Sequence, residues 1–356
     1  MNKFYLLLLL STLLHSQFTK GQGIDKELDE YISSQTDMRK CSGAVLVSHQ
    51  GKIIFQKSYG FANIEKKKEN KLTTQFRIGS ITKQFTAVLI MQLVEQKKIN
   101  LNDMIADHLS KIGLKTKATI KELLNQTSGI QDYTEVGLDC DASKQIPIDN
   151  QKFAKCFSML ISEFEPGTKF SYSNTNYYLL GLLIEKVEGK PFEQVLKANI
   201  LTPLQMGSTG YLDNRNLHDL AQGYKMQDDK LTSVNIEDVK KAYSAGGMYS
   251  TVDDLFKWDQ ALRTDKLLRK ESREQIFAEN NSVDPSFYGF GWYVGDNSEF
   301  KDYRTFHEGG IDGFSACIDR YIDTGICIIV LSNFEFTESR VDFTEPIAKI
   351  VFNSIK

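Results

Sequence analysis

Runs of apolar residues near both ends of the chain predict two β-hairpins. The four runs lie, in order, at residues 42–49, 52–59, 313–321 and 326–332. A Gln50-Gly51 turn joins the first two runs, and the turn Asp323-Thr-Gly325 joins the last two. Short apolar runs separated by Gly-containing turns are typical of paired strands.

Between these hairpins the apolar positions change to helical spacing. After Ser80 they recur every three or four residues, as they do in an amphipathic helix. Similar patterns cover Tyr177–Val187, and Val252–Leu262 behind a Ser250-Thr-Val-Asp253 capping sequence. Residues 346–355 predict a closing helix.

Strands at both ends with helices between them predict an α+β fold, an α/β sandwich. The N- and C-terminal strands would form one antiparallel sheet flanked by helices. A mostly helical subdomain, at roughly residues 100–240, would be inserted into it. A cleft between the two parts is the expected place for a ligand. We therefore expect one domain over residues 23–356.

The first 22 residues have a different pattern. Lys3 precedes an apolar run over 4–14, which is followed by a polar stretch. This order is typical of a secretory signal peptide, and the run is too short to span a bilayer comfortably. We expect residues 1–22 to direct export, giving a secreted or periplasmic protein with no stable membrane insertion. A buried N-terminal helix is the alternative.

Composition excludes a disordered chain, a collagen-like chain and a membrane protein with several spans. The 356 residues are 41% hydrophobic and 25% charged, which is ordinary for a globular chain. The formal net charge of −3 gives no electrostatic signature of nucleic-acid binding, so no nucleic-acid partner is expected.

The chain has five cysteines, an odd number, and no Cys-x-x-Cys pair. A zinc or redox motif is therefore not indicated. Cys140 and Cys156 flank a polar stretch and could close it with a disulfide. The alternative is that they are small buried hydrophobic residues.

Ser80-Ile-Thr-Lys83 is the first of three motifs that could carry chemistry. A spacing of three residues on a helix puts the lysine amine within reach of the serine hydroxyl. Ser80 at a helix start also offers its backbone N–H to a developing oxyanion. By itself the motif also fits a helix-capping serine beside a solvated lysine.

The second motif is Tyr172-Ser173-Asn174. A tyrosine hydroxyl beside a cationic lysine would have its phenolate favoured and could shuttle a proton. The Asn174 amide could hold a substrate amide. A buried tyrosine beside a helix-capping residue is the alternative.

The third motif, His307-Glu308-Gly309-Gly310, comes just before the last hairpin. Its two glycines would let a substrate backbone approach closely, and the Gly310 N–H could be a second oxyanion donor. A glycine-rich turn with a surface histidine is the alternative.

Taken together, the three motifs resemble the fingerprint of the serine β-lactamase, penicillin-binding protein and class C-like esterase superfamily: S-x-x-K, then Y-x-N, then H-x-G. Further segments resemble family blocks in family order. These are Phe76–Lys83, Leu123–Ile130, Glu165–Asn174, Ala245–Ser250 and Leu331–Asn333. The resemblance runs from about Ser42 to the C-terminus and implies a β-lactamase/transpeptidase-like fold.

This resemblance implies a role for each motif residue. Ser80 would be the acylated nucleophile, with Lys83 and Tyr172 sharing the general base and acid roles. Asn174 and His307 would orient the substrate, which Gly309 and Gly310 would also bind. The backbone N–H groups of Ser80 and Gly310 would form the oxyanion hole. No metal or cofactor is implied. The substrate would be a small molecule or peptide, such as an ester, a D-amino-acid peptide or a β-lactam, and a cell-wall-derived molecule is one candidate.

Two departures from the family pattern matter. His307 stands where many β-lactamases have a lysine, so a permanent cation for a substrate carboxylate is absent there. This favours esters or peptides over lactams. Gln126 replaces a histidine common in relatives, and we expect its effect to be minor. No glutamate is placed to activate a deacylating water, so this step would fall to Lys83 and Tyr172.

Other catalytic classes are not supported. The sequence has no G-x-S-x-G elbow, no HExxH and no G-x-G-x-x-G after a predicted strand. The remaining alternative is a protein that binds penicillin or peptidoglycan without turnover, as a sensor or a binding module.

Overall fold

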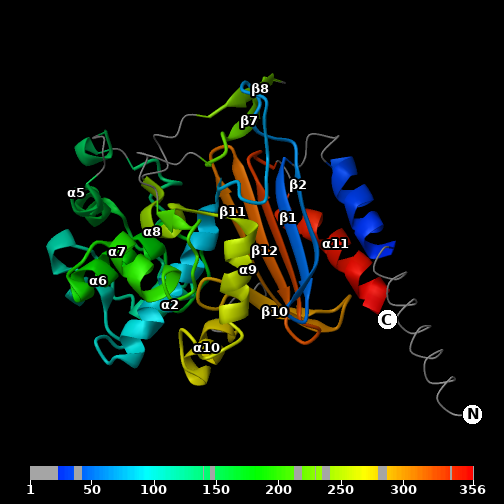
Figure 1. Cartoon of the computed structure of the whole chain (residues 1–356). Helices are drawn as coiled ribbons and strands as arrows, with labels where there is room; N and C mark the ends of the chain where they lie inside the picture. The colour runs from blue at the N-terminus through cyan, green and yellow to red at the C-terminus, as the bar shows by residue number, and fades with distance from the viewer. Residues whose placement is uncertain are drawn as a thin grey trace, which may run out of the picture.

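The computed structural model describes residues 23–35, 42–138, 140–144, 149–211, 219–228, 230–234, 241–279, 287–336 and 339–355 (Figure 1). The predicted signal peptide lies outside the described residues, as does Cys41. No helix in these ranges is both long and apolar enough to cross a membrane.

A six-stranded antiparallel sheet forms the centre of the molecule, with strand order β10-β11-β12-β13-β1-β2. Its strands are β1 (Gly43–His49), β2 (Lys52–Tyr59), β10 (Tyr293–Asn297), β11 (Asp302–Ile311), β12 (Phe314–Tyr321) and β13 (Ile326–Ser332). Gly43 pairs with Ser332 and His49 with Ile326, so the two predicted hairpins join at β1 and β13. The α+β fold and the sheet built from both ends of the chain are confirmed.

The sheet separates two apolar cores. Ala44 and Leu46 of β1 belong to the core on one face, whereas Val45 and Val47 belong to the core on the other. Alternate residues of a strand point to opposite faces, which explains this division. Residues 23–35 and α11 (Arg340–Ile355) cover the second core, on the right of Figure 1.

The first core contains α2 (Thr82–Glu95), which packs among the other helices on this side of the sheet (Figure 1). Residues Thr82–Met91 are all buried, as expected for a helix enclosed on every side. The longer helices around it are α6 (Asn174–Glu188), α9 (Val252–Ala261) and α10 (Lys270–Phe277). The short ones are α3 (Ile105–His108), α4 (Ile120–Leu124), α5 (Asn150–Lys155), α7 (Phe192–Leu196) and α8 (Tyr243–Gly246).

Shorter elements complete the described chain. The small strands are β3 (Phe61–Asn63), β4 (Lys68–Glu69), β5 (Phe76–Arg77), β6 (Gly210–Tyr211), β7 (Tyr224–Gln227), β8 (Lys230–Ser233) and β9 (Met248–Ser250). The single-turn helices are η1 (Gly79–Ile81), η2 (Ser110–Ile112), η3 (Asp141–Lys144), η4 (Cys156–Met159) and η5 (Lys197–Leu201). Most described elements between residues 100 and 240 are helical, and the boundaries of a helical insertion stay a prediction.

Three element boundaries differ from the sequence pattern. The cap of α9 is Thr251, whose side chain accepts from the Asp254 N–H, one residue later than expected. Helix α6 begins at Asn174, so the Tyr-Ser-Asn motif runs directly into it. Helix α11 begins before Pro346, because Phe343 is buried in the second core and holds the first turn in place.

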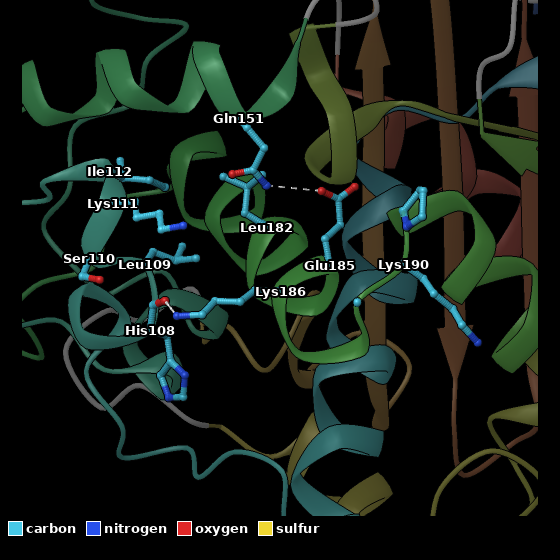
Figure 2. A pocket seen from close by; sticks show the side chains of 12 residues that line it. His108, Leu109, Ser110, Lys111, Ile112, Gln151, Leu182, Glu185, Lys186 and Lys190 are labelled. Carbon is cyan, nitrogen blue, oxygen red and sulfur yellow. Dashed lines mark hydrogen bonds between the residues drawn. The ribbon is translucent and has the colours of Figure 1, made fainter.

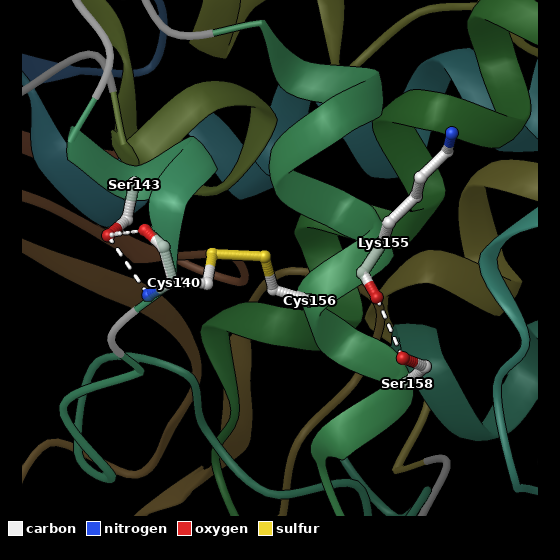
Figure 3. Close-up of a disulfide and its surroundings, with 5 residues drawn as sticks. All are labelled: Cys140, Ser143, Lys155, Cys156 and Ser158. Atoms are coloured by element: carbon white, nitrogen blue, oxygen red, sulfur yellow. Dashed lines mark hydrogen bonds between the residues drawn. A yellow bond between two sulfur atoms is a disulfide. The ribbon is translucent and has the colours of Figure 1, made fainter.

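A disulfide joins Cys140 to Cys156, whose Cα atoms are 6.5 Å apart (Figure 3). It closes the polar stretch that follows residues 131–138, the first of the two alternatives that the sequence left open. Cys317 and Cys327, in β12 and β13, are free and buried.

Strand β11 lies directly against η1, and Gly309 permits this contact. A Cβ atom at Gly309 would lie 2.0 Å from the carbonyl oxygen of Ile78. Gly309, the first glycine of the third motif, therefore allows two backbone segments of the protein to pack together. The sequence predicts a different use for this glycine, which is the close approach of a substrate backbone.

We predict that Gly309→Ala lowers the free energy of unfolding by about 1–3 kcal/mol, because the added methyl group overpacks this contact. Urea denaturation measures the change. Gly207→Ala is the matched control, because a Cβ atom there meets nothing within 4 Å. Equal stability of the two variants would contradict the prediction.

Candidate active site

Ser80 and Lys83 are brought together by the turn from η1 into α2. The Lys83 Nζ lies 3.0 Å from the Ser80 Oγ, as the three-residue spacing predicted. Ser80 is partly exposed, whereas Lys83 has no exposed surface. Gly79, just before the serine, has a φ of +48° and allows the sharp entry into the turn.

Three oxygens surround the Lys83 amine. Besides Ser80 Oγ, they are the Asn174 Oδ1 and the Ala245 carbonyl oxygen, each 2.8 Å from Nζ. Burial lowers the pKa of Lys83 to about 7, although the negative charge of Asp132 acts in the opposite direction. The neutral amine is thus well populated near neutral pH. Since an amide oxygen and a carbonyl oxygen only accept, the two N–H groups of this amine face them and its lone pair faces Ser80.

Tyr172 lies beside the serine and the lysine, but its hydroxyl keeps its proton. The Lys83 Nζ is 4.8 Å from the centre of the Tyr172 ring, over its face. Burial raises the pKa of Tyr172 well above its usual value, and a hydrogen bond with Ser80 only partly offsets this effect. The phenolate that the sequence led us to expect is therefore not favoured here, because burial of the hydroxyl raises its pKa.

Asn174, the first residue of α6, has both ends of its amide bound within the protein. Its Oδ1 accepts from Lys83, and its Nδ2 donates to the Asp132 carboxylate at 2.8 Å. Its backbone N–H donates to the same carboxylate oxygen at 2.9 Å. The expected contact with a substrate amide stays a prediction.

His307 lies inside β11 and is 2% exposed, so the surface turn considered as an alternative is wrong. Its Nδ1 is 2.6 Å from the Glu308 carbonyl oxygen, which can only accept, and this contact places the ring proton on Nδ1. The Nε2 then accepts from the Tyr288 hydroxyl at 2.9 Å. Burial, together with the charge of Lys83, lowers the pKa of His307 to about 3, so the ring is neutral.

The backbone of Gly310 lies against the turn that carries Ser80. A Cβ atom at Gly79 would be 2.9 Å from the Gly310 nitrogen, which shows how closely the two segments approach. Gly310 itself is exposed. The structure therefore brings together Ser80, Lys83, Tyr172, Asn174, His307, Gly309 and Gly310, all seven residues that the sequence selected.

Sequence reasoning missed three supporting groups, which are the Asp132 carboxylate, the Tyr288 hydroxyl and the Ala245 carbonyl. It singled out a fourth, Gln126, but expected its effect to be minor. Gln126 has a φ of +63°, and its Oε1 accepts from the Ser173 N–H at 3.1 Å and from the Asn176 Nδ2 at 2.7 Å. It thereby ties the Tyr-Ser-Asn segment to the preceding loop. The family block that contains Gln126 was a signal in the sequence that this residue matters. Nothing in the sequence indicated which groups its side chain contacts.

A separate pocket of about 480 Å³ lies at the far end of α6, between α3, α5 and the residues after the helix (Figure 2). None of the predicted site residues lines it. Within the described part of the chain, no group of three His, Cys, Asp or Glu side chains could hold a metal ion.

Comparison with known proteins finds related sequences over most of the chain. The sequence profile of the Beta-lactamase family matches residues 28–350. Penicillin-binding protein 4* of Bacillus subtilis (strain 168) is 31% identical over 330 residues, covering 87% of this chain and 72% of that protein.

Two solved structures share the fold. The penicillin-binding protein from Bacillus halodurans has a TM-score of 0.79 and 26% identity, over 90% of this chain and 99% of that one. The D-amino acid amidase from Ochrobactrum anthropi SV3 has a TM-score of 0.77 and 22% identity, over 94% and 98% of the two chains. With its fold, its sequence and the meeting of its three motifs in agreement, this chain belongs to the Beta-lactamase family, whose members are serine hydrolases.

Proposed function

We propose that this protein is an exported serine hydrolase that forms an acyl-enzyme at Ser80. The observation that carries the proposal is the environment of Lys83. Its amine is fully buried, has a pKa lowered to about 7, and is held by two carbonyl-type oxygens so that its lone pair faces the Ser80 hydroxyl. A base with a pKa near the working pH is well matched to proton abstraction.

In the acylation step, the Ser80 Oγ attacks the substrate carbonyl carbon while Lys83 takes the hydroxyl proton. The backbone N–H groups of Ser80 and Gly310 stabilise the oxyanion that forms. As the bond to the leaving group breaks, Tyr172 donates its proton to that group. The proton that Lys83 took from Ser80 is then passed to the Tyr172 phenolate, which restores the neutral amine and the tyrosine hydroxyl.

Deacylation reverses these roles. Water attacks the acyl carbon, its proton is taken on the Lys83 and Tyr172 side, and Ser80 leaves with a proton. The neutral, hydrogen-bonded His307 supports Tyr172 from the side, with the two ring centres 6.1 Å apart. No metal or cofactor takes part in this mechanism.

The substrate proposed is an ester or a D-amino-acid peptide in preference to a β-lactam. The neutral His307 supplies no positive charge for a substrate carboxylate at the position where many β-lactamases have lysine. Export is proposed from the pattern of residues 1–22 and agrees with the Cys140–Cys156 disulfide, because disulfides persist in oxidising compartments. A cell-wall-derived peptide would be encountered there.

We predict that Ser80→Ala abolishes turnover of p-nitrophenyl acetate and labelling by a fluorescent penicillin, because the nucleophile is removed. Ser173→Ala is the matched control, since the Ser173 hydroxyl is buried without a hydrogen-bond partner. It should retain activity. Circular dichroism checks that both variants are folded. Activity close to wild type in Ser80→Ala would exclude this nucleophile, and labelling without turnover in the wild type would favour a binding protein.

We predict that kcat/KM for p-nitrophenyl acetate rises with pH through a midpoint near 7 and then levels off, because only the neutral Lys83 amine accepts the Ser80 proton. Lys83→Ala should slow acylation by about 10²–10⁴. Lys98→Ala, which removes an exposed partner of Glu188, should leave the rate unchanged. A rate independent of pH from about 5 to 9 would contradict a lysine base.

We predict a substrate order in which kcat/KM for small esters and D-alanyl peptides exceeds that for nitrocefin, because no cation at His307 holds the lactam carboxylate. Parallel assays of nitrocefin, p-nitrophenyl acetate and a D-Ala-D-Ala peptide measure this order. A kcat/KM for nitrocefin above those for the ester and the D-Ala-D-Ala peptide would contradict the proposed substrate preference.

A further inference from the structure

Asp132 is a buried carboxylate directly behind the catalytic residues. It is 6% exposed, and both of its oxygens accept hydrogen bonds. Oδ2 accepts from the backbone N–H and the Nδ2 of Asn174, and Oδ1 accepts from the backbone N–H and the hydroxyl of Thr134. We propose that Asp132 is a positioning residue of this site, which fixes the orientation of the Asn174 amide and acts on Lys83 through its negative charge.

The orientation of the Asn174 amide follows from the chemistry of its two neighbours. A carboxylate only accepts hydrogen bonds, so the NH₂ end of the amide must face Asp132. The amide oxygen then faces Lys83, which donates to it at 2.8 Å. A reversed amide would set its NH₂ group against the lysine and its oxygen against the carboxylate, which loses both bonds. The charge-assisted bond to Asp132 therefore selects the orientation that the Lys83 base requires.

The charge of Asp132 also reaches Lys83. The other groups around the amine are neutral: the Ser80 hydroxyl from η1, the Asn174 amide and the Tyr177 ring from α6, the Tyr172 ring, His307 from β11 and the Ala245 carbonyl from α8. Among the described groups, Asp132 supplies the negative charge that raises the Lys83 pKa against the effect of burial. Without that charge, the amine would lose its proton at a lower pH.

The surrounding structure holds Asp132 in this position. The next residue, Tyr133, packs against Phe153 and Phe157, and its hydroxyl donates to the Lys241 carbonyl. The disulfide then ties the end of this stretch, at Cys140, to the residue just before Phe157 (Figure 3). The carboxylate also receives the first backbone N–H of α6, whose cap residue Ser173 makes no side-chain hydrogen bond. Asp132 thus has a structural role as well, which the experiment must separate from its effect on the base.

The test is the pH profile of Asp132→Asn, which keeps the shape of the side chain and removes its charge. The rate measured is Ser80 acylation, followed as the burst of p-nitrophenol from p-nitrophenyl acetate, because it does not require turnover. We expect the midpoint of the profile to shift toward acid by about one pH unit, in the direction expected when a neighbouring opposite charge is lost. A residue with only a structural role would lower the rate at every pH and leave the midpoint in place, which would overturn the proposal.

Asp254→Asn is the matched control. Asp254 is 2% exposed and also accepts from a backbone N–H and a hydroxyl, those of Ser208 and Thr209, but none of its hydrogen bonds reaches the catalytic residues. The pH profile of Asp254→Asn should have the same midpoint as that of the wild type. A shift as large as that of Asp132→Asn would overturn the proposal.

Asp132→Glu provides a second variant in case Asp132→Asn does not fold. It keeps the charge and displaces the carboxylate by one methylene, so we expect a lower rate with the midpoint retained. An acid shift in this variant would count against the role of the charge. The inference rests on the proposed function, and the two can fail separately. If the burst does not require Ser80, the proposed function is wrong. If the burst requires Ser80 but the midpoint of the Asp132→Asn profile stays at the wild-type pH, only the proposed role of Asp132 is wrong.

Discussion

The burial of one lysine amine is the constraint on which the rest of the site depends. A lysine side chain with no solvent contact is expensive to keep charged, and it needs a hydrogen-bond partner for each N–H that it retains. Here the partners come from three different elements: Ser80 from η1, Asn174 from α6 and Ala245 from α8. Each of these elements therefore has to reach its place for the amine to be both buried and satisfied.

The same constraint explains why backbone atoms are so prominent around the site. Gly309 and Gly79 lie where β11 meets η1, and a side chain at either position would meet backbone atoms of the other segment. Gly291 has a φ of +78°, and a Cβ atom there would lie 2.9 Å from the Lys83 carbonyl oxygen. At these points the segments around Ser80 and Lys83 meet their neighbours through main-chain atoms, so a side chain has no room there.

Features encoded by neighbouring residues could be predicted from the sequence. The two hairpins depend on local turns, and the Ser80–Lys83 contact depends on a spacing of three residues, so both were found. The direction of the Tyr172 pKa could not be predicted, because it depends on burial by elements far away in the sequence. Asp132 was missed for a related reason: a single aspartate has no spacing signature when its partner, Asn174, lies 42 residues later. The hydrogen bonds of Asn174 with Lys83 and Asp132, and of His307 with Tyr288, could not be predicted for the same reason.

The pairing of β1 with β13 has a consequence for how the chain reaches its active state. Gly43 pairs with Ser332, so the centre of the sheet closes only when segments almost 290 residues apart in the chain have met. Contacts of this sequence separation are slow to form and cannot be made while the second strand is still being synthesised. Strand β11, which supplies His307 and Gly310, pairs with β12 and reaches β1 only through β13. The nucleophile therefore exists early in synthesis as a serine on an incomplete scaffold, and acquires its chemistry only with the last strands.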